Sequence, residues 1–146
     1  MSSRRRLKLM RSIAIEITRE LSKKEGIIGI LTFGSVVTGE VHAESDVDIA
    51  VIMDDKLYTP GREIRLVKNI KVEIWTYPAS NFVNSLEKLS QKDAWMWSGL
   101  WIDMMRSSLI LFDPESKLAA WKNIALNWRW RISNIMEALE RSKSNI

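Results

Sequence analysis

The sequence of 146 residues has no cysteine, one histidine and no long apolar run. Without cysteine the chain can form neither a disulfide nor a thiolate metal site, which is consistent with the cytoplasm. The basic segment over residues 1–8 is followed by apolar positions that Arg11, Glu16 and Arg19 interrupt. We therefore expect no signal peptide and no membrane span, and we predict a cytoplasmic protein.

Two common phosphate-binding motifs are also missing. Gly34 and Gly39 have the spacing of the glycines in a P-loop, but Glu40 stands at the position of the required lysine. No G-x-G-x-x-G sequence follows an apolar run, so a dinucleotide-binding fold has no support. A phosphate site in this chain would have to be built in another way.

The composition indicates one globular domain. Apolar residues make up 46% of the chain and the net charge is +4. This balance is typical of a folded chain, and the length suits a single core. We predict one domain over residues 1–146, with a core at about 1–78 and a C-terminal helical part at about 79–146. The modest positive charge permits a nucleotide, RNA or an acidic protein as partner without requiring one.

The spacing of apolar residues predicts an α+β fold, in which a mixed β-sheet is flanked by helices and followed by a C-terminal helical extension. Short branched runs bounded by turn residues indicate strands, and apolar residues at i, i+3, i+4 and i+7 indicate helices. The predicted strands cover residues 27–33, 46–53, 64–67, 70–77 and 108–112. The predicted helices cover residues 4–24, 35–38, 93–106 and 115–143, and a further helix begins at Ser80.

The segment from Gly34 to Asp48 joins two predicted strands and carries the candidate chemistry. A Gly34-Ser35 pair at the end of a buried strand exposes main-chain N–H groups that suit an anion such as phosphate. Asp46 and Asp48 lie two apart on the next strand, so their carboxylates share one face, roughly 7 Å apart. Because like charges at the end of a buried sheet repel each other, divalent cations are their expected counter-ions.

Gly34-Ser35, ten intervening residues and Asp46-x-Asp48 resemble the signature of the polymerase-beta-type nucleotidyltransferases. In particular, the chain resembles the minimal nucleotidyltransferases of bacteria and archaea, some of which are antitoxins of HEPN-domain ribonucleases. The resemblance implies a nucleotidyltransferase-type sheet over about the first two thirds of the chain. It also implies a third carboxylate, usually aspartate, on the strand beside the Asp-x-Asp strand. Glu73 is the candidate, although its extra methylene gives it a different reach.

The resemblance further implies a metal cofactor, a nucleotide substrate and a protein partner. Asp46, Asp48 and Glu73 would bind Mg²⁺ or Mn²⁺, and Gly34 and Ser35 would bind the phosphates of a nucleoside triphosphate. Glu73 could also deprotonate the acceptor hydroxyl. The predicted reaction transfers AMP from ATP to a hydroxyl of a partner protein, which by resemblance is a HEPN toxin, and releases pyrophosphate. We expect no DNA partner and no membrane partner.

Several alternatives stay open. The acceptor hydroxyl could belong to a small molecule, although few residues after Ser80 are left for a substrate domain. The chain could bind a nucleotide or a partner without chemistry, which the departure at Glu73 favours. Glu73 could instead pair with Lys71 on an exposed strand, and residues 34–48 could be a simple turn and hairpin. The basic residues at 4–6 either contact RNA or an acidic partner or form a solvated helix face.

Tryptophan is the other unusual feature of the composition. Seven tryptophans occur, and six of them follow residue 94. Trp95 and Trp97 diverge by about 200° on a helix, so they cannot both face one core. Either the last helix or a second subunit must cover the remaining side, and a homo-oligomer is therefore one expectation.

Overall fold

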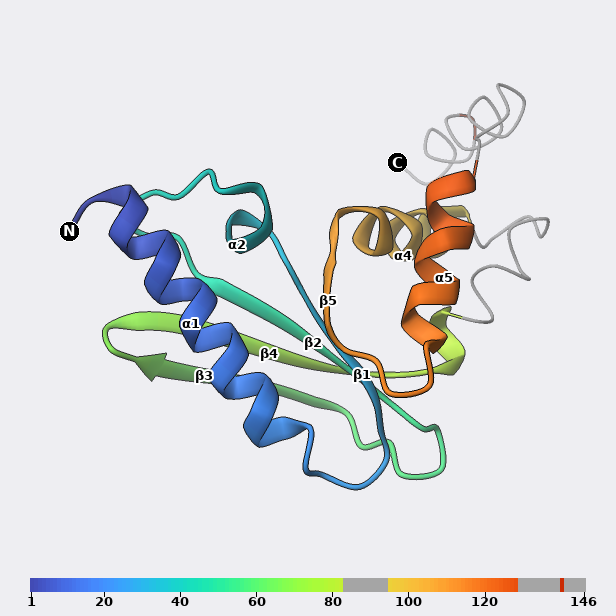
Figure 1. Cartoon of the computed structure of the whole chain (residues 1–146). Coiled ribbons are helices and arrows are strands. Elements are labelled where there is room, and N and C mark those ends of the chain that lie inside the picture. The colour runs from blue at the N-terminus through green and yellow to red at the C-terminus, as the bar shows by residue number, and fades with distance from the viewer. Residues whose placement is uncertain (83–94, 129–139, 141–146) are drawn as a thin grey trace.

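The computed structural model describes residues 1–82, 95–128 and 140. In this part of the chain a five-stranded mixed sheet has α1 packed along it and α4 and α5 gathered at one end (Figure 1). The elements in chain order are α1 (Ser3–Leu21), β1 (Ile27–Phe33), α2 (Ser35–Thr38), β2 (Val47–Met53), β3 (Gly61–Val67), β4 (Ile70–Pro78), α4 (Trp95–Ser107), β5 (Leu109–Phe112) and α5 (Lys117–Asn127). None of the described helices is long and apolar enough to cross a membrane.

The strands lie in the order β3–β4–β2–β1–β5, so β2 is the central strand. β2 and β4 are parallel, whereas the other neighbouring pairs are antiparallel. The apolar side chains of β2 alternate between two clusters. One cluster, packed by α1, contains Val47, Ile49, Val51 and Met53. The other contains Ala50 and Ile52, so β2 is covered on both sides.

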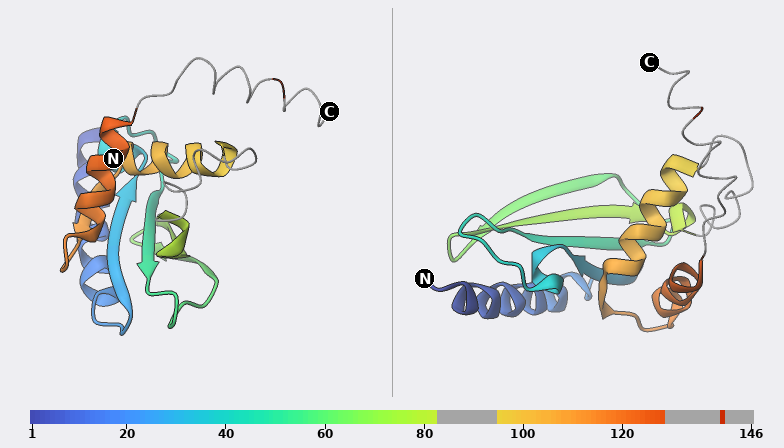
Figure 2. Two further views of the ribbon diagram at one scale, coloured as in Figure 1. Left: turned by 90° about the vertical axis from the view of Figure 1, so that its right-hand side faces the viewer. Right: turned by 90° about the horizontal axis from the view of Figure 1, so that it is seen from above.

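Helix α1 buries the apolar stripe that its sequence predicts against one face of the sheet (Figure 2). The Ser2 hydroxyl caps its start by accepting a hydrogen bond from the Arg5 N–H. The helix ends at Leu21, three residues before the predicted end, and the Ser22 hydroxyl donates to the carbonyl of Arg19 in the last turn. Gly26, with a φ of +86°, turns the chain toward β1 instead of closing the helix.

The β3–β4 hairpin turns where the sequence predicts. Lys68 and Asn69 both have positive φ angles, 50° and 66°, as a two-residue hairpin turn requires. β3 begins at Gly61, three residues earlier than predicted, because its pairing with β4 extends to Thr76. β3 is therefore a seven-residue edge strand.

The C-terminal part contributes to the sheet as well as covering it. β5 pairs with β1, and Leu118 and Ala125 of α5 pack in the second cluster with Phe82, Trp101 and Ile102. The Asp113 carboxylate accepts hydrogen bonds from the N–H groups of Leu118 and Ala119, which fixes the start of α5.

The prediction of one long helix over residues 115–143 is wrong at its centre. α5 ends at Asn127, and Trp128 has an extended conformation with a ψ of 136°. The Arg106 side chain donates to the carbonyls of Ala125 and Trp128, so it takes up acceptors that a continuing helix would use. The predicted helical positions at 86, 89 and 129–139, and the side chains of Trp95 and Trp97, lie outside what the structure describes.

Candidate functional site

The Gly34-Ser35 corner lies beside Asp48 because of the register between β1 and β2. Phe33, the last residue of β1, pairs with Asp48, so the next two residues leave the sheet next to its carboxylate. The buried Thr32 donates its hydroxyl to the Asp48 main-chain carbonyl at 2.7 Å, which holds the two strands together at this point. Pairing of the two strands thus brings the phosphate-binding candidates to Asp48.

Gly34 cannot easily be another residue. Its φ of +81° and ψ of −148° lie in a region that is essentially restricted to glycine. A Cβ atom there would also lie 3.3 Å from Asp48 Oδ2. Ser35 then begins α2, which ends at Gly39 in the left-handed conformation, as predicted. The first N–H groups of such a helical turn have no acceptor within it and remain available to an anion.

The three predicted carboxylates meet at the same end of the sheet. Asp48 and Glu73 are register partners on the parallel strands β2 and β4, and Asp46 directly precedes β2. Burial raises the pKa of Asp48, and the negative charges of Glu73 and Asp46 raise it further, while Lys71 opposes this. The structure therefore brings together all five residues that the sequence singles out.

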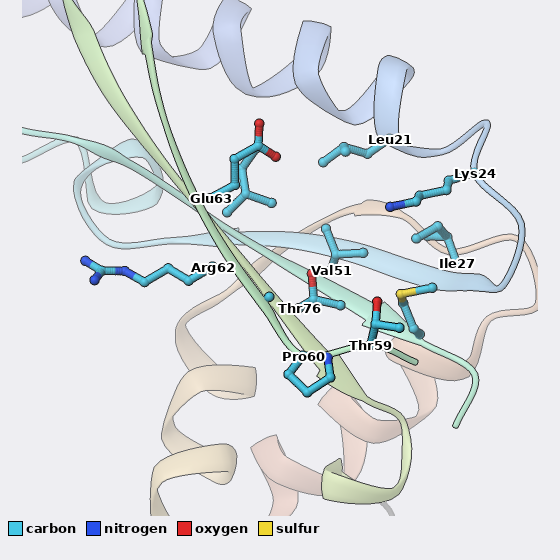
Figure 3. A pocket seen from close by; sticks show the side chains of 12 residues that line it. Leu21, Lys24, Ile27, Val51, Thr59, Pro60, Arg62, Glu63 and Thr76 are labelled. Carbon is cyan, nitrogen blue, oxygen red and sulfur yellow. The ribbon is translucent and has the colours of Figure 1, made fainter. Parts of the chain in front are cut away.

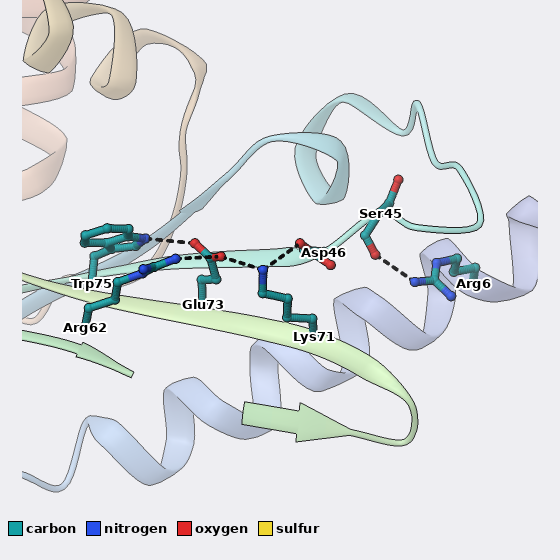
Figure 4. A network of polar contacts seen from close by, with 7 residues as sticks. All are labelled: Arg6, Ser45, Asp46, Arg62, Lys71, Glu73 and Trp75. Carbon is teal, nitrogen blue, oxygen red and sulfur yellow. Dashed lines mark hydrogen bonds and ion pairs between the residues drawn. The ribbon is translucent and has the colours of Figure 1, made fainter. Parts of the chain in front are cut away.

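Glu73 is held by cations from its own strand and from β3 (Figure 4). Lys71 Nζ lies 2.9 Å and Arg62 3.2 Å from Glu73 Oε1, and the Trp75 indole N–H donates to Oε2 at 3.3 Å. The hydrogen bond and charge of Lys71, followed by those of Arg62, lower the pKa of Glu73. The pairing with Lys71 is the arrangement that the alternative interpretation describes.

The donor set suits a hard divalent cation, because all three candidate ligands are carboxylates. As the side chains stand, no three His, Cys, Asp or Glu residues among those described converge closely enough to hold a metal ion. Lys71 also approaches Asp46 Oδ2 at 3.8 Å, so its ammonium contacts two of the carboxylates. A cation at Asp46, Asp48 and Glu73 would require Lys71 to move.

Two basic residues of α1 have roles that the sequence did not reveal. Arg6 donates to the carbonyl of Ser45 at 2.8 Å, directly before Asp46 (Figure 4). Arg11 donates to the carbonyl of Val36 in α2 at 3.1 Å. These bonds tie the loop and the Gly34-Ser35 corner to α1. The sequence carries no signal for them because main-chain carbonyls are acceptors at every position.

A pocket of about 190 Å³ lies elsewhere, between the end of α1 and the start of β3 (Figure 3). It is lined by Leu21, Val51 and Ile74, among others, and the last two belong to the cluster that α1 covers. Strand alternation therefore puts it on the opposite face of the sheet from Asp48 and Glu73. The Arg62 side chain points away from the other labelled side chains in Figure 3, and its guanidinium lies 3.2 Å from Glu73.

This fold, with a Gly-Ser corner beside an Asp-x-Asp strand, defines a nucleotidyltransferase-type domain. The family described as "Polymerase beta, Nucleotidyltransferase" matches residues 16–90, which is just over half of the chain. The chain belongs to this family.

A solved structure supports the fold independently. The chain is similar to a nucleotidyltransferase-like protein from Exiguobacterium sibiricum 255-15, with a TM-score of 0.57 and 15% sequence identity. The match covers 82% of this chain but only 39% of that protein, so the chain spans well under half of its length. No curated protein sequence matches significantly.

Proposed function

We propose that the chain is a divalent-cation-dependent nucleotidyltransferase that transfers AMP from ATP to a hydroxyl group of a partner protein. One observation carries this: the Gly34-Ser35 corner, Asp48 and Glu73 lie side by side on three adjacent elements, in register. A phosphate-binding corner and a group of carboxylates at the same sheet end are the parts that phosphoryl transfer needs.

The order of these parts along the sheet assigns a task to each residue. The N–H groups and hydroxyl at Gly34 and Ser35 would hold the β and γ phosphates on the β1 side of Asp48. The acceptor oxygen would then approach the α phosphorus from the Glu73 side, and the bond to pyrophosphate would break opposite to it. Asp46, Asp48 and Glu73 would hold divalent cations, which would neutralise the charge of the phosphates.

Glu73 fits a restricted role in this arrangement. Its lowered pKa makes it a weak base, so it is better suited to accept a hydrogen bond from the acceptor hydroxyl and orient it. The proton released on bond formation can pass through Glu73 to solvent. Positioning and charge neutralisation, rather than strong base catalysis, would then provide most of the rate enhancement.

The surface beside Glu73 supports a protein as acceptor. Ile64 and Leu66 of β3 are register neighbours of Glu73 and Lys71, so they lie on the same face of the sheet. They are 53% and 73% exposed, so together they present apolar surface beside Glu73. A polar small molecule would not use such a surface, whereas a protein would cover it. A HEPN-domain ribonuclease is the partner that the family resemblance suggests.

The test is transfer of label from α-³²P-ATP, with Mg²⁺, to protein in a lysate of the source cell. We expect one labelled protein band with wild type and none with Asp46→Asn. Asp54→Asn is the matched control, because Asp54 follows the other end of β2 and should leave labelling unchanged. The other three nucleoside triphosphates test the preference for ATP.

The other outcomes separate the alternatives. Pyrophosphate release without a labelled protein would contradict a protein acceptor and indicate an RNA or small-molecule hydroxyl. Neither label nor pyrophosphate, with wild type folded and a HEPN protein co-purifying, would overturn the proposed enzyme and leave a binding module.

A further inference from the structure

Lys71 has a position among the carboxylates that the proposed chemistry does not explain. It lies two residues before Glu73 on β4, so the two side chains are on the same face of the sheet. Because Val47 pairs with Val72, continuing this register by one residue places Lys71 opposite Asp46. Its ammonium lies 2.9 Å from Glu73 Oε1 and 3.8 Å from Asp46 Oδ2 (Figure 4). Of the ion pairs in the described part of the chain, only those of Lys71 join two of the three carboxylates.

A divalent cation bound by the same carboxylates needs the same oxygen atoms. It would also repel the ammonium, because two positive charges a few ångströms apart are poorly screened when the carboxylates around them are partly buried. Glu73 is 15% exposed and Asp46 34% exposed, so both carboxylates are partly shielded from water. Lys71 itself is 43% exposed, which allows its flexible side chain to turn into solvent.

We propose that Lys71 is a built-in competitor for the divalent cation, so that it sets the cation concentration at which the site loads. The inference rests on the proposed function, since it assumes a cation at Asp46, Asp48 and Glu73. The Lys71 ammonium pairs with both Glu73 and Asp46, and a cation gains these oxygens only when the ammonium withdraws. Arg62, on the next strand, does not have this role, because Glu73 is the one member of the three carboxylates with which it forms an ion pair.

The experiment measures Mn²⁺ binding to the full chain by isothermal titration calorimetry, without nucleotide and therefore without turnover. We expect Lys71→Met to bind Mn²⁺ about tenfold more tightly than wild type, because one competing positive charge is gone. Lys68→Met is the matched control: it removes the same charge from the turn of the same hairpin and should bind as wild type does. Asp48→Asn should bind weakly or not at all.

The outcomes distinguish this inference from the proposed function. If wild type binds Mn²⁺, Asp48→Asn does not, and Lys71→Met binds no more tightly, the competitor role is overturned and the site stands. If neither wild type nor Lys71→Met binds Mn²⁺, the cation site is overturned together with the inference. Lys71→Gln provides a second variant, and circular dichroism establishes that each variant is folded.

Discussion

Burial and two neighbouring carboxylates raise the pKa of Asp48, so its ionised form is less stable in the folded chain than in water. We predict that Asp48→Asn raises the melting temperature by about 3 °C at pH 7 in the presence of EDTA, while it abolishes nucleotidyl transfer. Asparagine keeps the shape of the side chain and removes the charge. Thermal melts by circular dichroism of both proteins measure the difference.

The same prediction has a definite pH dependence. Because the pKa of Asp48 in the folded chain lies above its ordinary value of 3.8, the folded wild type takes up its proton first as the pH falls. As the pH falls from the pKa of Asp48 in the folded chain to 3.8, wild type gains stability relative to Asp48→Asn. The higher melting temperature of the variant should therefore disappear over this pH range. An advantage that persists below pH 3.8, or a lower melting temperature of the variant at pH 7, would contradict this origin.

Single residues differ in how far sequence could predict them. Gly34, Ser35, Asp46 and Asp48 were predictable because their spacing is local and strand geometry fixes where they meet. Glu73 is predictable only through the family resemblance, which implies a carboxylate on the strand beside the Asp-x-Asp strand, although a charge between two apolar neighbours also needs a reason. Its pairing with Arg62 was not predictable, because only the β3–β4 register brings the two together.

At the level of elements, strands were predicted well and the last helix was not. Strand positions follow from short branched runs between turn residues, and this signal is local. In the last helix the apolar spacing continues from Leu118 to Leu139 without a glycine or proline. The end at Asn127 is marked instead by Arg106, which reaches it from α4. A break stabilised by another element leaves no trace in helical periodicity.

The contact between β1 and α5 gives an element-level prediction. Gly29 leaves room for Leu118, since a Cβ at Gly29 would lie only 2.4 Å and 2.5 Å from its two methyl carbons. We predict that Gly29→Ala lowers the free energy of unfolding by about 1–3 kcal/mol through overpacking. Leu118→Ala, at a fully buried position, should lower it by about 2–5 kcal/mol through the cavity it leaves.

The double variant tests whether the two effects share one contact. Leu118→Ala removes the methyl groups that would clash, so the double variant should be less destabilised than the sum, by about 1 kcal/mol. Urea unfolding of all four proteins measures this coupling. Gly61→Ala is the control, because its Cβ would meet Thr76 at an ordinary 3.6 Å. Additive effects at residues 29 and 118 would show that the strand and helix adjust independently.

At the scale of the whole molecule, β5 joins the two parts of the chain into one structure. It pairs with β1 at the edge of the sheet. Leu111 and Phe112 pack against the cluster under α1, while Ile110 packs with α4 and α5 in the second cluster. A core ending near residue 78 would therefore lack a strand and part of each apolar cluster, although its local sequence signals are complete.

We accordingly predict that the full chain unfolds in one transition and that a fragment ending at residue 107 does not fold. In the full chain, urea curves by far-UV circular dichroism and by tryptophan fluorescence should coincide, although six of the seven tryptophans follow residue 94. In the fragment, β1 becomes an exposed edge and Leu31 loses its contact with α5, which favours aggregation over folding. Two outcomes would contradict this prediction: a fragment that melts cooperatively, or a full chain that unfolds in two separate transitions. Either would show that α1 to β4 is a domain of its own and that the C-terminal helices are an addition to it.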